Sequence, residues 1–191
     1  MDEPRPGPAP LYPLGLRLEG RGVVVVGAGA VALRRVAGLL AAGADVTVVA
    51  PVATPALADL AATGRVRWLE RPYRSGDLAG AWLALACTDR PDVNRAVAAE
   101  AELDRILCVR ADDASAATAW VPASGRTGPY TLAVHADRDP RRAAAMRDRR
   151  RDCCALRGRL YRWFRAPARS RAIPCRSQGE ARSFWTESSS R

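Results

Sequence analysis

A run of four valines followed directly by a glycine-rich turn is the feature that most restricts the fold of this chain. The run ends a segment at residues 22–26, and residues 27–32 fit the pattern Gly-x-Gly-x-x-Gly/Ala. A short, unbroken apolar run is typical of a parallel strand covered on both faces. Residues 30–42 then show apolar side chains at helical spacing and end at Gly43, while residues 46–49 indicate a second buried strand. This segment therefore predicts a strand–helix–strand unit.

Apolar runs and helical patterns continue to alternate after this unit. Five strands with helices between them predict an α/β fold of the Rossmann type, in which a doubly wound parallel sheet has a nucleotide crevice at the carboxyl ends of its strands. The further elements that we expect are helices over residues 54–62 and 91–103, and strands over residues 65–69, 81–87 and 106–109.

The second half of the chain predicts a smaller unit and a tail. Two strand-like runs, at residues 118–122 and 130–135, flank a turn-rich stretch at 124–129, and a helical pattern starts at residue 143. From residue 149 onward the sequence is rich in Arg and Ser and has little periodicity. We therefore expect three parts: a nucleotide-binding domain over 1–113, a strand and helix segment over 114–150, and a tail over 151–191 that is partly helical or disordered.

The glycine-rich turn has the form of a dinucleotide-binding fingerprint. Gly27 permits a tight turn, Gly29 lets the backbone approach a pyrophosphate, and Ala32 lets the helix pack closely on the strand. The helix N-terminus then offers backbone N–H groups and a partial positive charge to the phosphates. A purely structural glycine turn is the alternative interpretation. Ala50-Pro51 stands where an acidic residue usually binds the ribose hydroxyls, so this motif alone does not decide between NAD and NADP.

The net charge of +10 belongs to the C-terminal part of the chain alone. Residues 1–137 hold 14 Arg against 15 acidic residues, whereas residues 138–191 hold 16 Arg against five. A nucleic-acid-binding arm is one interpretation of this tail, but it contains no recognised reading motif, and we expect no nucleic-acid partner. The sequence has no lysine, which excludes Schiff-base chemistry and a P-loop lysine.

The remaining composition argues against a membrane protein and against a tightly bound metal. No apolar run approaches the roughly 20 residues of a membrane-spanning helix, and residues 1–10 lack the pattern of a secretory signal. We expect a cytoplasmic protein with a loose N-terminal arm. The five cysteines and the single histidine, His135, form no cluster at metal-ligand spacing, so we expect no metal site. His135 continues an alternating strand pattern, which favours a half-buried structural residue over a metal ligand or a base.

A series of ordered segments between residue 11 and about residue 150 resembles the siroheme synthase N-terminal family. Members of this family act as precorrin-2 dehydrogenases and often as sirohydrochlorin ferrochelatases. The resemblance implies an enzyme of siroheme biosynthesis that oxidises the tetrapyrrole precorrin-2 with NAD, with Fe²⁺ as a transient second substrate. It also implies a homodimer formed through residues 114–150. The segments that carry it are residues 12–22, 24–35 and 43–51, Ala86-Cys-Thr-Asp89, Asp112-Asp113, Val121-Pro122 and Arg138-Asp-Pro-Arg-Arg142.

The resemblance also implies particular site residues. The family's essential aspartate follows the strand at 106–109, and spacing within the matched segments places it at Asp112, with Asp113 beside it. A carboxylate there could act as general base, taking the proton that leaves the macrocycle together with a hydride. A solvated turn or a helix cap is the alternative interpretation of these two aspartates. The implied NAD contacts are Gly27, Gly29, Ala30 and Val31 in the fingerprint, and Pro51 and Val52 after the second strand.

The chain also departs from the family pattern near the expected site. His135-Ala136-Asp137 stands where the family has a Ser/Thr-Gly stretch, and Val109-Arg110-Ala111 stands where it has an asparagine before the aspartate. A catalytically impaired NAD-binding remnant or sensor of the same fold is therefore the alternative function. For an active enzyme, the candidate partners of the substrate's carboxylates are Arg126, Arg138, Arg141 and Arg142.

Overall fold

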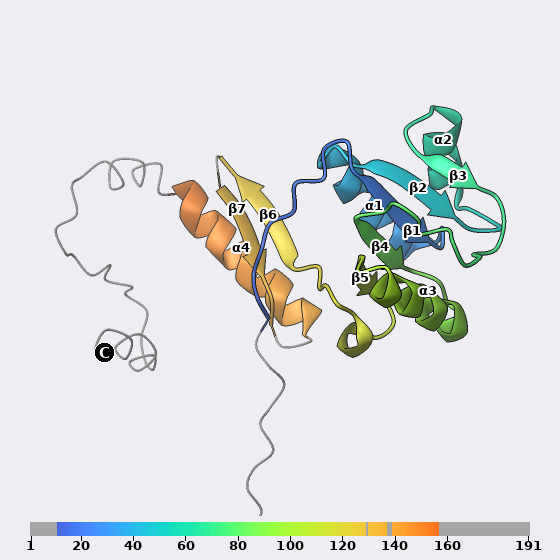
Figure 1. The fold of residues 1–191 in the computed structure, drawn as a ribbon. Coiled ribbons are helices and arrows are strands. Elements are labelled where there is room, and N and C mark those ends of the chain that lie inside the picture. Colours follow the sequence, from blue (N-terminus) through green and yellow to red (C-terminus); the bar gives the residue numbers. More distant parts are fainter. Residues whose placement is uncertain (1–10, 129, 137–138, 157–191) are drawn as a thin grey trace, which may run out of the picture.

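A five-stranded parallel sheet forms the first part of the computed structural model, which describes residues 11–128, 130–136 and 139–156 (Figure 1). The strand order is β3-β2-β1-β4-β5, so the direction in which strands are added reverses between β1 and β4. This is the Rossmann arrangement, and it confirms the predicted doubly wound α/β fold. The elements are β1 (Gly22–Val26), α1 (Ala30–Ala41), β2 (Asp45–Val49), α2 (Pro55–Ala62), β3 (Arg67–Leu69), β4 (Leu83–Ala86), α3 (Pro91–Leu103) and β5 (Leu107–Arg110).

Two apolar clusters, one on each face of the sheet, hold these elements together. Val23 and Val25 of β1 lie in one cluster with Val36 of α1. Val24 and Val26 face the opposite way and lie in a second cluster with residues of α3. Because β1 is covered on both faces, every position after its first residue is buried, which explains the unbroken run of valines.

Gly27 ends β1 at a position that only glycine fits. Its φ angle is +106°, and a Cβ atom there would lie 2.6 Å from the carbonyl oxygen of Cys87 at the end of β4. On the other side, its N–H donates a hydrogen bond of 2.9 Å to the carbonyl of Val49 in β2. The turn is therefore held between the two strands that flank β1, which fixes the point at which α1 begins.

A second, smaller unit consists of an antiparallel hairpin and a helix that packs against both of its strands (Figure 1). The hairpin is β6 (Ala123–Thr127) and β7 (Tyr130–Val134), the helix is α4 (Pro140–Leu156), and a short 3₁₀ helix, η1 (Ala114–Ala116), precedes them. The predicted strand at 118–122 is wrong, and most of the turn-rich stretch at 124–129 is β6. Its sequence, Ala-Ser-Gly-Arg-Thr, has little intrinsic strand preference, so pairing with β7 and packing under α4 determine its conformation.

The remaining boundaries lie close to those expected from the sequence. The five sheet strands and three helices of the first part begin and end within two residues of the predicted positions. Helix α4 starts three residues earlier than expected and runs to residue 156, across the boundary expected at 150. The expectations for residues 1–10 and 157–191 lie outside the described residues. Within the described part of the chain, none of the helices is both long and apolar enough to cross a membrane.

Replacing each fingerprint glycine by alanine should separate their roles in stability. We expect Gly27→Ala to lower the free energy of unfolding by at least about 2 kcal/mol, because it combines a positive φ with a backbone clash. Gly29→Ala should change it by less than about 1 kcal/mol, since Gly29 has a φ of −79° and open space around the Cβ position. Urea denaturation followed by circular dichroism measures both, and equal stability of the two variants would contradict the prediction.

Candidate functional site

The residues that the sequence singles out lie at one edge of the parallel sheet. Gly27 and Gly29 follow β1, Pro51 and Val52 follow β2, and Asp112 follows β5. Because all five strands are parallel, their carboxyl ends share this edge, where ligands of doubly wound folds bind.

The turn between β1 and α1 can accept an anionic group. Gly29 is the N-cap residue of α1, and neither an acidic side chain in the first turn nor a side-chain cap occupies this end of the helix. The first backbone N–H groups of a helix have no partner within the helix, and they carry the positive end of its dipole. The Cβ of any other residue at position 29 would project into the open space beside them. This cradle fits the pyrophosphate of a dinucleotide.

The segment after β2 provides an uncharged surface beside that cradle. Pro51 and Val52 are exposed, and the carbonyl of Ala50 accepts a hydrogen bond of 2.9 Å from the indole N–H of Trp68. Asp45 is the first residue of β2 and lies at the opposite end of the strand, so its carboxylate is not at this edge. A nucleotide bound here would therefore meet backbone and apolar atoms rather than an acidic side chain.

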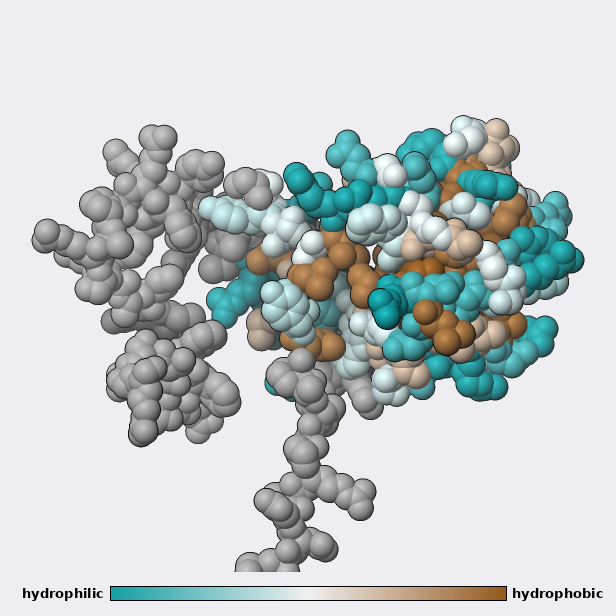
Figure 2. All heavy atoms as spheres, in the orientation of Figure 1, coloured by the Kyte–Doolittle hydropathy of each residue, from teal (hydrophilic) through white to brown (hydrophobic). Residues whose placement is uncertain are grey.

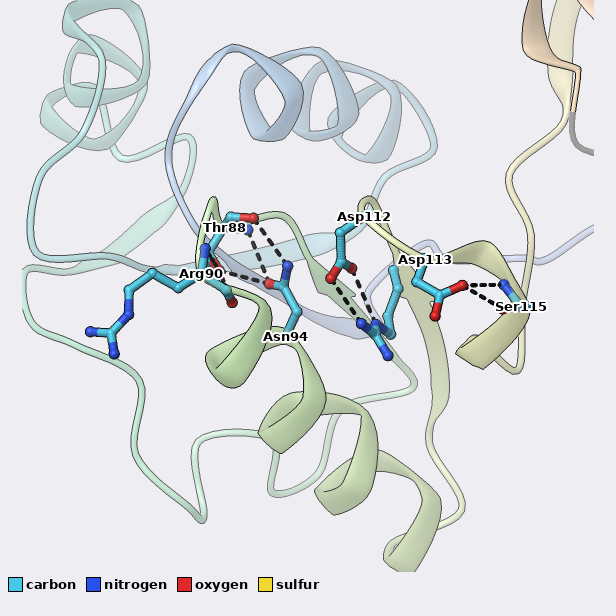
Figure 3. A network of polar contacts seen from close by, with 7 residues as sticks. Thr88, Arg90, Asn94, Asp112, Asp113 and Ser115 are labelled. Atoms are coloured by element: carbon cyan, nitrogen blue, oxygen red, sulfur yellow. Dashed lines mark hydrogen bonds and ion pairs between the residues drawn. The ribbon is translucent and has the colours of Figure 1, made fainter.

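Asp112 forms a two-point ion pair with Arg110, the last residue of β5 (Figure 3). The Arg110 Nε and Nη2 atoms donate to Oδ1 and Oδ2 of Asp112 at 3.1 and 2.8 Å. The Arg110 side chain is 7% exposed and that of Asp112 is 26% exposed. These hydrogen bonds, together with the nearby amide of Asn94, lower the pKa of Asp112 to about 2 and outweigh the opposing effect of burial. The carboxylate is therefore ionised at any physiological pH.

Asp113 has a different role, although it is the next residue. Its carboxylate accepts hydrogen bonds from the backbone N–H and the hydroxyl of Ser115 and caps the short helix η1. In Figure 3 its carboxylate points away from Asp112, toward Ser115. The interpretation as a helix cap is thus correct for Asp113, whereas Asp112 belongs to the ion pair.

Asn94 fixes the loop that follows β4. Its side chain is completely buried, and Oδ1 accepts hydrogen bonds from the Thr88 N–H at 3.2 Å and the Thr88 hydroxyl at 2.7 Å. Its Nδ2 donates to the Thr88 carbonyl at 3.0 Å. A buried amide with these three hydrogen bonds holds the end of β4 against α3, close to Asp112 (Figure 3). The sequence alone does not show this role of Asn94.

A cleft of about 1070 Å³ lies between the parallel sheet and the second unit. Asp112 is on its wall, whereas the expected cofactor residues border it only at Val31. This volume is at the upper end of the range for small-molecule sites, which suits a large ligand. The charged or titratable residues on its walls include Arg34 and Arg35 of α1, His135 after β7 and Arg147 of α4.

The comparisons with known proteins agree with this architecture. Residues 14–123 match the family model described as "Putative NAD(P)-binding". The chain is 32% identical over 125 residues to the precorrin-2 dehydrogenase of Bacillus subtilis, which covers 65% of this chain and 76% of that protein. The chain belongs to the siroheme synthase N-terminal family. The sequence resemblance to this family is thereby confirmed.

Further relatives of the siroheme synthase N-terminal family are longer than this chain. The siroheme synthase of Chromobacterium violaceum is 46% identical over 123 residues, which are 64% of this chain but 26% of that protein. The chain thus spans about a quarter of the length of that relative. Among solved structures, SirC, a precorrin-2 dehydrogenase, superposes with a TM-score of 0.67 at 28% identity, over 81% of this chain and 75% of that chain.

The structure corrects two further expectations about this family member. His135 is exposed and lines the cleft, because it continues the exposed side of β7 that Thr131 and Ala133 begin, so the prediction of a half-buried structural residue is wrong. Arg126, Arg141 and Arg142 are exposed away from the cleft, and Arg138 lies outside the described residues.

Sequence reasoning missed the arginines that do line the cleft, although α1 contains a usable signal. Val31, Arg34, Arg35 and Gly38 follow the i, i+3, i+4, i+7 spacing of a single helix face, directly after the fingerprint. The structure places all four residues on the cleft wall.

The ion pair of Asp112 should be visible in the acid stability of the protein. The lowered pKa stabilises the folded state above the ordinary aspartate pKa of 3.8, and this contribution is lost as the pH falls toward 2. Asp112→Asn should therefore be less stable than the parent at pH 6, and the difference should shrink by about 0.5 to 1 kcal/mol at pH 3, allowing for solvent screening. Urea denaturation at both pH values measures this difference. Asp45→Asn is the control. The prediction would be contradicted if the loss of stability in Asp112→Asn, relative to the parent, were the same at both pH values.

Proposed function

We propose that this chain is an NAD-dependent precorrin-2 dehydrogenase that oxidises precorrin-2 to sirohydrochlorin in siroheme biosynthesis. The observation that carries the proposal is the ionised Asp112 on the wall of a large cleft, at the sheet edge that also holds the dinucleotide-binding turn. Membership of a family with characterised precorrin-2 dehydrogenases supports the choice of substrate.

In this proposal the cofactor lies along the carboxyl edge of the sheet. The residues that contact its pyrophosphate are Gly29, Ala30 and Val31, and Gly27 shapes the turn that presents them. Pro51 and Val52 contact its adenosine half. β2 is followed neither by an acidic residue for the ribose hydroxyls nor by an arginine for a 2′-phosphate, so the choice of NAD over NADP rests on membership of the family. When bound, the nicotinamide ring supplies the hydride acceptor.

Asp112 is the proposed catalytic carboxylate. The oxidation removes a hydride and a proton from the macrocycle, and the loss of the hydride leaves positive charge on it. An anion fixed in advance by Arg110 stabilises that charge without reorganising. A carboxylate with a pKa of about 2 is a weak base, so Asp112 passes the proton on to solvent in the cleft rather than retaining it.

The second unit completes the proposal. The proposed domain organisation of the chain has three parts. A nucleotide-binding domain covers residues 1–113, a dimerisation segment covers 114–150 with α4 extending to residue 156, and a tail follows α4. Val121, Tyr130 and Met146 are exposed apolar side chains of this part, and Figure 2 shows apolar surface over the hairpin and the neighbouring sheet. Such surface favours a homodimer. The protein is proposed to act in the cytoplasm.

Ferrochelation is a second candidate function of the same cleft. The match to siroheme synthases favours it. Asp112 would accept pyrrole N–H protons as Fe²⁺ enters the macrocycle. Among the described residues, no group of three or more His, Cys, Asp or Glu side chains could hold a metal ion, so Fe²⁺ enters this proposal as a transient substrate.

Anaerobic formation of NADH from precorrin-2 and NAD, followed by absorbance, tests the proposed function. We expect the purified chain to turn over and Asp112→Ala to be at least about 100-fold slower, since it removes the proposed catalytic carboxylate. Asp113→Ala is the matched control. It removes the neighbouring carboxylate, which only caps η1, and should keep most of the activity.

Other outcomes identify which part of the proposal fails. Full turnover by Asp112→Ala would contradict the catalytic role of Asp112. The proposal that the chain is a precorrin-2 dehydrogenase would still stand. Absence of turnover in the parent, with NAD binding retained in calorimetry, would favour the catalytically impaired remnant or sensor.

A further inference from the structure

Two neighbouring arginines lie on the face of α1 that lines the cleft. Arg34 is exposed, and Arg35 is half-buried. Burial and the adjacent positive charge of Arg34 both lower the pKa of Arg35, so its charged form is less stable than in water. Two adjacent guanidinium groups therefore face the cleft at an electrostatic cost.

Within the described residues, no carboxylate lies within ion-pair distance of either arginine. The other arginines of the cleft are paired: Arg110 with Asp112 at 2.8 Å, and Arg147 with Asp148 at 2.9 Å. Neither Arg34 nor Arg35 forms an ion pair with any described residue. The pair is thus available to an anionic ligand, because a partly buried charge is stabilised when an anion joins it.

The position of the pair separates it from the phosphate cradle. Arg34 lies five residues after Gly29, which corresponds to about 7 Å along the helix axis. It shares the cleft with Asp112, whereas Gly29 does not line it. An anion held by the two arginines would therefore lie on the substrate side of the site.

We propose that Arg34 and Arg35 form a subsite that binds peripheral carboxylates of the tetrapyrrole substrate; this proposal rests on the proposed function. A guanidinium group matches a carboxylate with two parallel hydrogen bonds, so two arginines can hold two of the side chains on one edge of the macrocycle. With that edge fixed on α1, the macrocycle extends across the cleft toward Asp112. The pair thus positions the substrate and selects for tetrapyrroles with several carboxylates.

Binding of uroporphyrin, an octacarboxylate porphyrin, to the full chain tests this subsite through fluorescence titration. We expect Arg34→Gln and Arg35→Gln each to raise the Kd about 10-fold or more, because each removes a charge-assisted contact. Arg95→Gln is the matched control: it removes an exposed arginine from α3, which covers the other face of the sheet, and should leave the Kd unchanged. Affinity for NAD, measured by calorimetry, should be the same in all variants.

Kinetics with precorrin-2 give the second readout. The KM should rise in the Arg34 and Arg35 variants with little change in kcat, as for a residue that binds the substrate and its transition state equally. Unchanged Kd and KM in both variants would overturn the subsite even if the parent is an active dehydrogenase. An equal loss of NAD affinity would also overturn it, by assigning the arginines to the cofactor. Failure of the proposed function is distinguishable, because the parent itself would then lack turnover.

Discussion

The close approach of Gly27 to the end of β4 is the constraint on which the site depends. Because the turn has no side chain, it lies between β2 and β4 and directs α1 away from the carboxyl edge of the sheet. This one contact places the helix N-terminus at the crevice and the face that carries Arg34 and Arg35 along the cleft. A local requirement for glycine thus sets the geometry of both the cofactor and the substrate sides.

Electrostatics divide the cleft into two regions. On one wall, Arg110 and Asp112 neutralise each other and fix a carboxylate in one orientation. Elsewhere on the cleft wall, the two arginines of α1 form no ion pair with any described residue. A ligand with carboxylates at its edge and a reacting ring fits this division. Its carboxylates would meet the arginines of α1, and the positive charge that develops on its ring would meet the carboxylate of Asp112.

The second unit makes a cleft out of an open sheet edge. A two-stranded hairpin is only marginally stable alone, so α4 must cover it. The hairpin and helix contribute His135 and Arg147 to the wall of the cleft.

The sequence by itself determined the parallel sheet, its helices and the nucleotide turn, because periodicity and glycine spacing report local burial and backbone shape. Only the tertiary structure decided that β6 is a strand, that Asp112 pairs with Arg110 while Asp113 caps a helix, and which arginines line the cleft. Adjacent aspartates look alike in a sequence, and β6 owes its conformation to pairing with β7 and packing against α4 rather than to its own residues. Contacts of these kinds depend on how elements pack in space, and local patterns carry no record of that packing.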